Sequence, residues 1–215
     1  MPIASPPSAI DSLPDSLRSL ARRGELRRYR KRTVLIQEGE QGDTLFIIVS
    51  GRLRVFASGD KGREITYGTY GPGEYVGEMS LDGGSRSATV ITEASSDCVV
   101  VTRRTLLQHI AERPEFALEL LAKVIRRARA ATLSAKQLAL NDVYGRLVML
   151  LDSLAMAQPN GARLIGQRLT HQAMANRLGC SREMVSRLMK DLETGGYVAP
   201  SPEGLALLRV LPVRW

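Results

Sequence analysis

A long stretch without glycine or proline, from Glu115 to about Leu140, divides the chain into two parts of different texture. It follows Pro114, a residue that suits the first turn of a helix. From about Leu26 to Val101, short β-branched segments alternate with glycine turns. After about Leu140, helical patterns precede a closing hairpin. One long helix between a β-rich half and a helical half predicts two small domains joined by a rod.

Small and apolar residues recur along this helix at alternating steps of four and three. They are Ala117, Leu121, Val124, Ala128, Ala131, Ala135 and Leu138. Such steps form a heptad seam, and small residues in a seam let two helices approach closely. We therefore expect a homodimer coiled coil. The alternative is a helix that packs only on its own domain.

The β-rich half predicts an antiparallel barrel or roll, because its strands are short and its glycine turns regular. A Pro- and Ser-rich tail and a short helix, from about Asp11 to Gly24, precede it. The fold expected is α+β: a jelly-roll-like β-roll, a long dimerisation helix and a winged helix-turn-helix. The expected bounds are 1–25 for the tail and short helix, 26–112 for the roll, 113–140 for the long helix and 141–215 for the C-terminal domain.

One loop of the β half, GEYVGEMSLDGGSRSATV from Gly73 to Val90, holds an acid and a base among small residues. Glu78 precedes Arg86 by eight positions. A surface salt bridge does not need so much glycine, whereas a loop that closes around a small polar ligand does. Tyr67, on the strand before this loop, is expected to pack in the core, and the alternative is that it faces the ligand.

The segment HQAMANRLGCSREMVSRLMKDLE, from His171 to Glu193, has the spacing of a helix-turn-helix unit. Ala175 suits a close crossing of two helices, and Gly179 stands where the turn needs a positive φ. Ser181 is expected to cap the second helix. Asn141 and Asp142 are interpreted as a hinge before a further helix, Val143 to about Ala157.

The outer face of that second helix carries polar residues: Arg182, Glu183, Ser186, Arg187 and Lys190. When such a helix enters the major groove, arginine can bind guanine O6 and N7, and glutamate can accept from cytosine N4. A solvated amphipathic helix is the alternative. A glutamate among cations weakens phosphate binding, so it fits a contact with a base better than a nonspecific surface charge.

The composition agrees with a nucleic-acid partner. The formal net charge is +8, which predicts a polyanionic partner, either nucleic acid or an anionic membrane surface. No apolar run approaches the ~18 residues of a membrane span, and the N-terminus is not a secretory signal. Two cysteines, Cys98 and Cys180, favour a reduced, cytoplasmic protein. No metal site and no catalytic pairing is expected, and His109 is interpreted as a surface or satisfied histidine.

Both motifs, in this order and joined by a heptad helix, resemble the CRP/FNR family of bacterial transcription regulators, closest to its cyclic-AMP receptor branch. GEYVGEMSLDGGSRSATV resembles the family's phosphate-binding cassette, LGCSREMVSRLMKDLE its DNA-recognition segment and LNDVYGRL its hinge. The resemblance covers the chain from about Leu26 to Val210.

The resemblance implies a cyclic nucleotide, with cyclic AMP (cAMP) as the expected effector. Glu78 would accept from the ribose 2′-hydroxyl, and Arg86 would pair with the cyclic phosphate with help from Ser87. The ligand-binding residues implied are Gly77, Glu78, Met79, Arg86, Ser87, Arg127 and Thr132. A phosphate diester does need a guanidinium and N–H donors. One departure is Ala131, which stands where the branch has the first hydroxyl of a Thr-Ser pair that contacts adenine.

For DNA, the resemblance implies an inverted repeat with TGTGA-like half-sites. The residues implied are His171, Gln172, Ser181, Arg182, Glu183, Arg187 and Lys190. RNA polymerase is a further expected partner. Two alternatives remain open: the same fold with cyclic di-GMP, another small molecule or no ligand as its signal, and a cyclic-nucleotide regulatory module of an enzyme or channel.

Overall fold

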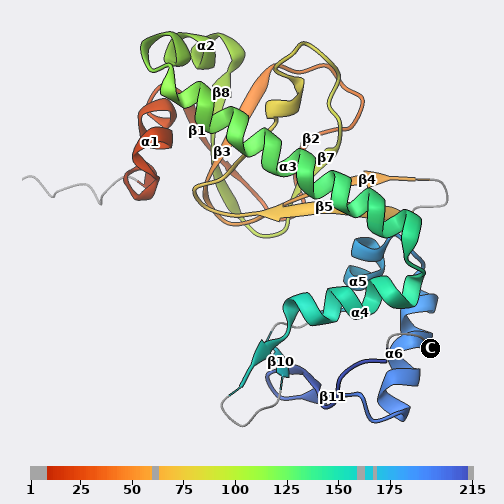
Figure 1. The fold of residues 1–215 in the computed structure, drawn as a ribbon. Coiled ribbons are helices and arrows are strands. Elements are labelled where there is room, and N and C mark those ends of the chain that lie inside the picture. The colour runs from red at the N-terminus through yellow and green to blue at the C-terminus, as the bar shows by residue number, and fades with distance from the viewer. Residues whose placement is uncertain (1–8, 60–62, 159–162, 167–168, 213–215) are drawn as a thin grey trace, which may run out of the picture. The chain divides into compact units, whose positions relative to one another are not determined.

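The structure of this protein is a computed structural model, which describes residues 9–59, 63–158, 163–166 and 169–212, and the side chains of 137–140 lie outside the described set. By Cα proximity the chain divides into two compact units: Met1–Ala57 with Thr66–Arg129, and Ser58–Ile65 with Ala130–Trp215. The order of elements along the chain is visible in Figure 1.

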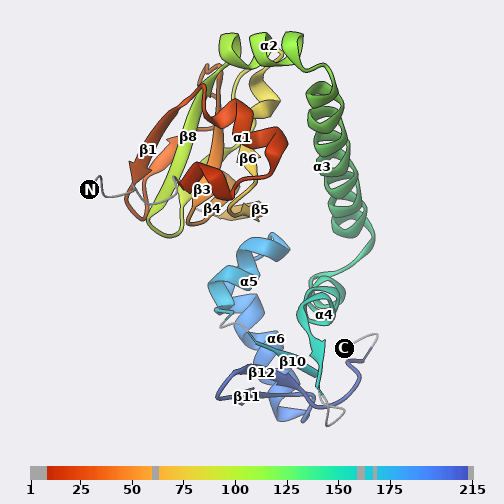
Figure 2. The ribbon, with the colours of Figure 1, turned by 90° about the vertical axis from the view of Figure 1, so that its left-hand side faces the viewer.

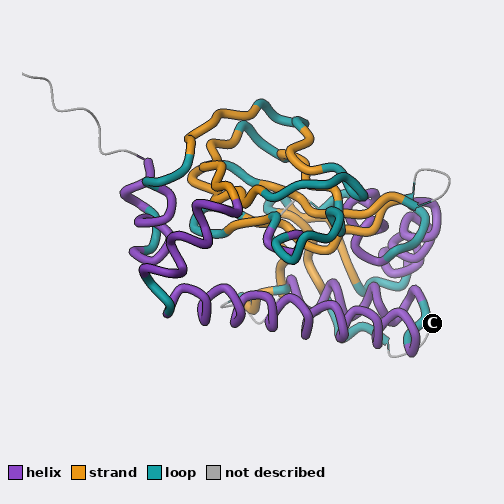
Figure 3. The backbone as a smooth tube through the Cα atoms, turned by 90° about the horizontal axis from the view of Figure 1, so that it is seen from above, coloured by secondary structure: helices purple, strands orange, loops and turns teal. Residues whose placement is uncertain are grey.

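Two four-stranded antiparallel sheets form the β-roll. One has the order β1 (Glu25–Tyr29), β8 (Ser96–Thr102), β3 (Thr44–Ser50), β6 (Tyr75–Val76). The other has the order β2 (Val34–Ile36), β7 (Thr89–Thr92), β4 (Leu53–Ser58), β5 (Glu64–Tyr70). Their strands are among those drawn in orange in Figure 3. The predicted roll is therefore confirmed.

Strand β3 is buried on both faces, which places its side chains in two different cores. Leu45, Ile47 and Val49 pack in the core that contains residues of the helices, whereas Phe46 and Ile48 pack in the core shared with the second sheet. This is the alternation expected of a strand. Cys98 lies fully buried in the second core, and burial raises its thiol pKa to about 12.

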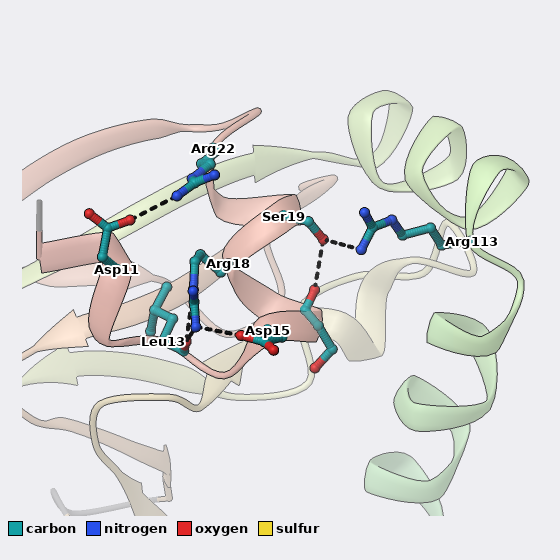
Figure 4. A network of polar contacts seen from close by, with 8 residues as sticks. Asp11, Leu13, Asp15, Arg18, Ser19, Arg22 and Arg113 are labelled. Atoms are coloured by element: carbon teal, nitrogen blue, oxygen red, sulfur yellow. Dashed lines mark hydrogen bonds and ion pairs between the residues drawn. The ribbon is translucent and has the colours of Figure 1, made fainter.

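Helices α1 (Asp15–Ala21), α2 (Arg103–Glu112) and the start of α3 (Glu115–Leu140) contribute to the first core through residues such as Leu20, Leu106 and Phe116. Arg113 donates to the Ser19 hydroxyl, which ties the α2–α3 corner to α1 (Figure 4). The predicted N-terminal helix is divided, because Pro14 is extended between a 3-10 turn, Ala9–Ser12, and α1.

The second unit contains a winged helix-turn-helix, visible in Figure 2. Helix α4 (Val143–Leu154) leads to α5 (His171–Leu178) and α6 (Arg182–Thr194), and a sheet of order β11 (Val198–Ser201), β12 (Gly204–Leu207), β10 (Arg163–Ile165), β9 (Met156–Ala157) completes it. The helices and sheet share one core, which includes Leu147, Ile165, Met174, Val185 and Leu207.

Three expectations from sequence were wrong. Helix α4 ends at Leu154 rather than Ala157, because Ala157 pairs with Arg163 in the sheet. Tyr67 is exposed rather than in the core. His109 is fully buried, and neither ring nitrogen has a hydrogen-bond partner among the described residues. No helix in the described part of the chain has both the length and the apolar character that a membrane span requires.

Candidate ligand pocket and nucleic-acid interface

A tight turn after β6 positions the acid of the loop. Gly77 has φ of 95°, and a Cβ there would lie 2.6 Å from the carbonyl oxygen of Thr44. Only glycine fits both this conformation and this close approach. The turn continues into a 3-10 helix, Glu78–Ser80, and the Glu78 side chain points into the protein with 1% of its surface exposed.

Arg86 is a buried cation whose hydrogen-bond acceptors are all neutral. One terminal nitrogen donates to the Gly77 carbonyl at 2.9 Å and to the Ser80 hydroxyl at 2.8 Å. The other donates to the carbonyl and hydroxyl oxygens of Thr44, both at 3.0 Å. Burial lowers the pKa of the guanidinium. Within the described residues, no carboxylate forms an ion pair with it. The Asp43 and Glu78 carboxylates act on Arg86 only from beyond ion-pair distance. A buried charge without a directly paired counter-charge is costly, so this site favours an anion.

Glu78 is paired with a residue of the long helix instead. Arg127 on α3 donates to Glu78 Oε1 and, at 2.6 Å, to the carbonyl of Tyr75. Its guanidinium also lies over the Tyr70 ring, 4.5 Å from the centroid. Burial and the nearby Glu78 carboxylate raise the pKa of Tyr75 to about 12.

Two polar atoms of this ion pair are buried without a partner in the described structure. They are Glu78 Oε2 and Arg127 Nε. A buried carboxylate oxygen without a donor is an open hydrogen-bonding position. A ligand hydroxyl would supply the donor that Glu78 lacks.

The structure brings four predicted ligand residues together: Gly77, Glu78, Arg86 and Arg127. Met79 and Ser87 lie exposed beside them, and the Ser87 hydroxyl is 3.7 Å from the Met79 sulfur. Thr132 and Ala131 are exposed on α3 in the second unit, so the structure does not assign them to the pocket.

Sequence reasoning missed four residues of this site: Thr44, Ser80, Tyr70 and Tyr75. Thr44 contacts Arg86 from 42 positions earlier in the chain, and nothing in its strand motif indicates that contact. Ser80 lies in the same loop as Glu78, six positions before Arg86. This spacing is the one sequence feature that could have indicated its contact with Arg86.

The long helix exposes an apolar stripe on the face away from the roll. Leu118, Leu121 and Ile125 have 69%, 53% and 41% of their surface exposed, and Ala128 continues the spacing of three and four. The predicted seam residues Ala131 and Ala135 are also exposed, whereas Ala117 and Val124 are half-buried. The side chain of Leu138 lies outside the described residues. Sequence reasoning missed Leu118 and Ile125.

In the second unit, the helix-turn-helix has the predicted local geometry. Gly179 ends α5 with φ of 66°, and the Ser181 hydroxyl accepts from the backbone nitrogen of Met184 at the start of α6. Ala175 and Val185 are fully buried where α5 and α6 share the core. These three predictions, for the turn, the cap and the crossing, are confirmed.

The outer face of α6 is open to solvent. Arg182, Glu183, Arg187 and Lys190 are exposed on it. His171 Nδ1 and the Ser186 hydroxyl are 2.9 Å apart, which joins the start of α5 to α6. Gln172 is exposed and donates to Asn176. The face thus presents three cations and one carboxylate together, a set that can bind phosphates and base edges.

A further residue of this unit, Arg146, links the hinge to the helix-turn-helix. Its Nε donates to the carbonyl of Leu178, the last residue of α5, at 3.2 Å. Its Nη1 donates to the carbonyl of Asn141 at 2.8 Å. The hinge is also capped, because Asp142 accepts from the backbone nitrogen of Gly145 at 2.7 Å.

Comparison with known proteins finds a family match in each of the two units. A family model described as "Cyclic nucleotide-binding domain" matches residues 26–113, and one described as "Bacterial regulatory proteins, crp family" matches residues 168–197. The chain is 34% identical over 198 residues to the CRP-like cAMP-activated global transcriptional regulator of Mycobacterium tuberculosis, covering 89% of this chain and 84% of that protein. The chain belongs to the CRP/FNR family.

Other CRP/FNR proteins extend the comparison. The cAMP-activated global transcriptional regulator CRP of Haemophilus influenzae is 32% identical over 175 residues, which cover 78% of this chain and 77% of that protein. Among solved structures, the c-di-GMP responsive global regulator CLP of Xanthomonas campestris has a TM-score of 0.77 and 27% identity, over 89% of this chain and 97% of that one. These relatives are transcription regulators, which confirms the prediction of a regulator rather than an enzyme.

Proposed function

We propose that this CRP/FNR regulator is controlled by a cyclic nucleotide, cAMP being the candidate, bound in the β-roll against Glu78, Arg86 and Arg127. The observation that carries the proposal is the buried Arg86 guanidinium, whose described acceptors are all neutral. A cyclic phosphate would supply the missing counter-charge through charge-assisted hydrogen bonds. Gly77 would let the backbone approach the phosphate closely, and Ser87 would provide a hydroxyl beside the phosphate.

The ribose would meet Glu78. Its Oε2 is buried and without a partner in the described structure, so a 2′-hydroxyl donor satisfies a position that is otherwise costly. Because Arg127 already holds Oε1, ligand entry has to rearrange or share this pair. Met79 is exposed at the edge of the site, and Thr132 is proposed to contact the base as part of a closed ligand-bound state.

The active species is proposed to be a homodimer held by α3. Its two recognition helices would bind an inverted repeat with half-sites like TGTGA, about one helical turn apart. Arg182 and Arg187 would each select a guanine and Glu183 a cytosine, while Lys190, His171, Gln172 and Ser181 would contact the backbone. Bound at such a site in the cytoplasm, the dimer would meet RNA polymerase.

Ligand would act by shifting a population. Arg127 contacts the pocket and stands on the helix that leads to the hinge, so a ligand that rearranges Arg127 changes the pose of α3. The shift in DNA affinity cannot exceed the ligand's preference for the DNA-competent state. Because Ala131 lacks the hydroxyl found at this position in the cyclic-AMP receptor branch, we expect one of two outcomes. Ligand binding is only modestly coupled to DNA binding, or the protein binds DNA markedly without ligand.

Cyclic di-GMP is the second candidate effector. The observation that favours it is the likeness to the c-di-GMP responsive regulator CLP, with a TM-score of 0.77 over 89% of this chain. A second guanidinium at the pocket, Arg127, would suit the second phosphodiester of that ligand once released from Glu78.

Isothermal titration of the full chain with cAMP, cyclic GMP and cyclic di-GMP tests the effector. We expect binding of cAMP and a loss of roughly thirtyfold or more in Arg86→Leu, since removing one partner of a buried charge pair costs about 2–5 kcal/mol. Arg104→Leu, which removes an exposed arginine of α2, is the matched control and should bind as wild type. No heat with any of the three ligands would refute the proposal, and binding of cyclic di-GMP alone would select the second candidate.

A further inference from the structure

A half-open cavity of about 280 Å³ lies in the first unit, and Tyr75, which lines it, also contacts Arg127 of the Glu78–Arg127 pair. Three segments line it: the start of α1 with Pro14, Ser16 and Leu17; the turn before β6 and the start of β6 with Gly73 and Tyr75; and the first turns of α3 with Phe116, Glu119, Ala122, Lys123 and Arg126. The ribbon of Figure 4 shows the first turns of α3 beside α1, where Arg113 bonds Ser19 and Ser19 donates to the carbonyl of Ser16. The α1 wall is therefore linked to the α2–α3 corner by a hydrogen bond.

Lys123 is the least exposed charged group at this cavity, and its ammonium forms no hydrogen bond within the described residues. Its side chain is 17% exposed, and its ammonium lies 4.1 Å from the centroid of the Tyr75 ring. The nearest described carboxylate, Glu74, is 3.9 Å away, beyond hydrogen-bond distance. Burial and the Arg127 charge lower the Lys123 pKa. An ammonium has three donors, so an anion in the cavity would meet donors that the fold leaves open.

The other lining groups limit the charge and shape of an occupant. Leu17, Tyr75 and Phe116 are buried core residues that offer apolar walls. Arg126 adds an exposed cation, and Glu119 adds an exposed carboxylate that disfavours a second negative charge. The volume is at the low end of ligand pockets, which are roughly 300–1,000 Å³ for drug-sized molecules.

We propose that this cavity is a second ligand site, which takes a small monocarboxylate with one apolar ring or a branched chain. The carboxylate binds Lys123, with Arg126 beside it, and the apolar body lies against Leu17, Tyr75 and Phe116. The α3 residues of the site lie on a different face of the helix from Leu118, Leu121 and Ile125, so a dimer formed through that stripe leaves the cavity open.

The site is placed to act on the nucleotide pocket, and this coupling rests on the proposed function. The Tyr75 ring lies 4.1 Å from the Lys123 ammonium and 5.9 Å from the Arg127 guanidinium, and the Tyr75 carbonyl accepts from Arg127. Lys123 and Arg127 are four residues apart and therefore adjacent on one face of α3. An occupant that draws Lys123 away from the Tyr75 ring would change the contacts that Tyr75 makes with Arg127. By linkage, each ligand then changes the affinity of the other by the same factor.

Titration of the full chain without nucleotide tests the site itself. The probes are phenylacetate, 3-phenylpropanoate and 3-methylbutanoate, with phenylacetamide as the uncharged isostere of phenylacetate and phenyl phosphate as the dianion. Calorimetry and ligand-observed NMR measure their binding. We expect at least one carboxylate to bind, at least tenfold more tightly than phenylacetamide or phenyl phosphate. Failure of all three carboxylates, or equal binding of the amide, would overturn the proposal, and preference for phenyl phosphate would overturn the assignment to a monocarboxylate.

Two variants separate charge from shape. Lys123→Met keeps most of the side-chain volume and should weaken carboxylate binding at least tenfold, and Ala122→Leu should block the cavity with no change of charge. Lys136→Met, an exposed lysine further along α3, is the matched control and should bind as wild type. Arg86→Leu should also keep carboxylate binding, which distinguishes this site from the nucleotide pocket. Unchanged binding in both cavity variants would refute the location. If a carboxylate binds but no nucleotide does, the site stands and the proposed effector falls.

Discussion

Arg127 of α3 forms an ion pair with Glu78 in the turn of the β-roll, and the partners are separated by 49 positions in the chain. The carboxylate is buried, and Arg127 is the cation that forms a hydrogen-bonded ion pair with it in the described structure. The pair joins the candidate ligand pocket to the helix that leads to the DNA-binding unit. It therefore contributes both to the stability of the roll and to the way in which a ligand could be sensed.

Replacing Arg127 should destabilise the roll because it leaves Glu78 charged, buried and unpaired. We expect Arg127→Met to lower the free energy of unfolding by about 3 kcal/mol, near the lower end for removing one partner of a buried pair. Urea unfolding of Arg127→Met, Glu78→Gln and the double variant measures the coupling energy, expected at about 1–3 kcal/mol. Arg129→Met, an exposed neighbour on α3, is the control. Additive effects of the two changes would contradict a direct pair.

Glutamates in the exposed stripe of α3 should prevent dimer formation and leave the monomer folded. Leu121 and Ile125 are 53% and 41% exposed, so Leu121→Glu with Ile125→Glu introduces charge at a surface rather than into the core. In a dimer these like charges would face each other across the two-fold axis. Light scattering should report the monomer mass. Leu107→Glu, at an exposed leucine of α2, should stay dimeric. A dimer in both variants would place the interface elsewhere.

Glu183 and Lys190 should differ in what their loss does to DNA binding. Glu183→Ala should relax the choice at one base pair of each half-site, at a cost of about 1–3 kcal/mol on the preferred sequence. Lys190→Ala should weaken all sequences alike and reduce the dependence of affinity on salt. Selection from a random DNA pool and titrations at several salt concentrations distinguish the two. An unchanged base preference in Glu183→Ala would reject its role as a reader.

Arg146 should transmit the effector signal without touching DNA or ligand. Because it bonds both Asn141 in the hinge and Leu178 at the end of α5, its loss frees the helix-turn-helix from the hinge. We expect Arg146→Met to bind nucleotide as wild type while the ligand-induced gain in DNA affinity falls at least threefold. DNA titrations with and without nucleotide give this ratio. Arg177→Met, an exposed arginine of α5, should keep the full gain. An unchanged ratio in Arg146→Met would assign Arg146 a purely structural role.

His109 should make the stability of the roll depend on pH. Burial, then the charges of Arg23 and Arg113, lower its pKa below the ordinary value of about 6.5, against smaller opposing effects of Glu112 and Glu115. The folded protein therefore binds the proton less well than the unfolded chain. Stability is fully present above about pH 6.5 and falls as the pH drops below it.

Urea unfolding between pH 5 and 8 measures this dependence. Its slope should shrink in His109→Phe, which can keep the ring packing on Phe116. The chain has 2 histidines, so His171→Gln is the natural control and should keep the slope. Equal slopes in wild type and His109→Phe would show that another group titrates.

The sequence determined the parts of this protein that depend on neighbours along the chain. Alternation of side chains predicted the strands, a run without glycine or proline predicted α3, and Gly179 with Ser181 predicted the turn and cap of the helix-turn-helix. Such features follow from local backbone sterics and hydrogen bonds within a few residues. The motif around Glu78 and Arg86 also indicated a polar ligand from local spacing alone.

The tertiary structure decided what those residues contact. Only the fold brings Thr44 to Arg86 and Tyr75 to Arg127, across 42 and 52 positions. The heptad pattern of α3 could not show which side faces the roll, and packing against the sheet half-buries Val124 while Leu118 and Ile125 stay exposed. The tertiary structure also buries His109, although the pattern of its helix did not distinguish it from a surface residue. Burial and long-range pairing depend on how sheets and helices enclose a core, and periodicity along the chain does not contain that information.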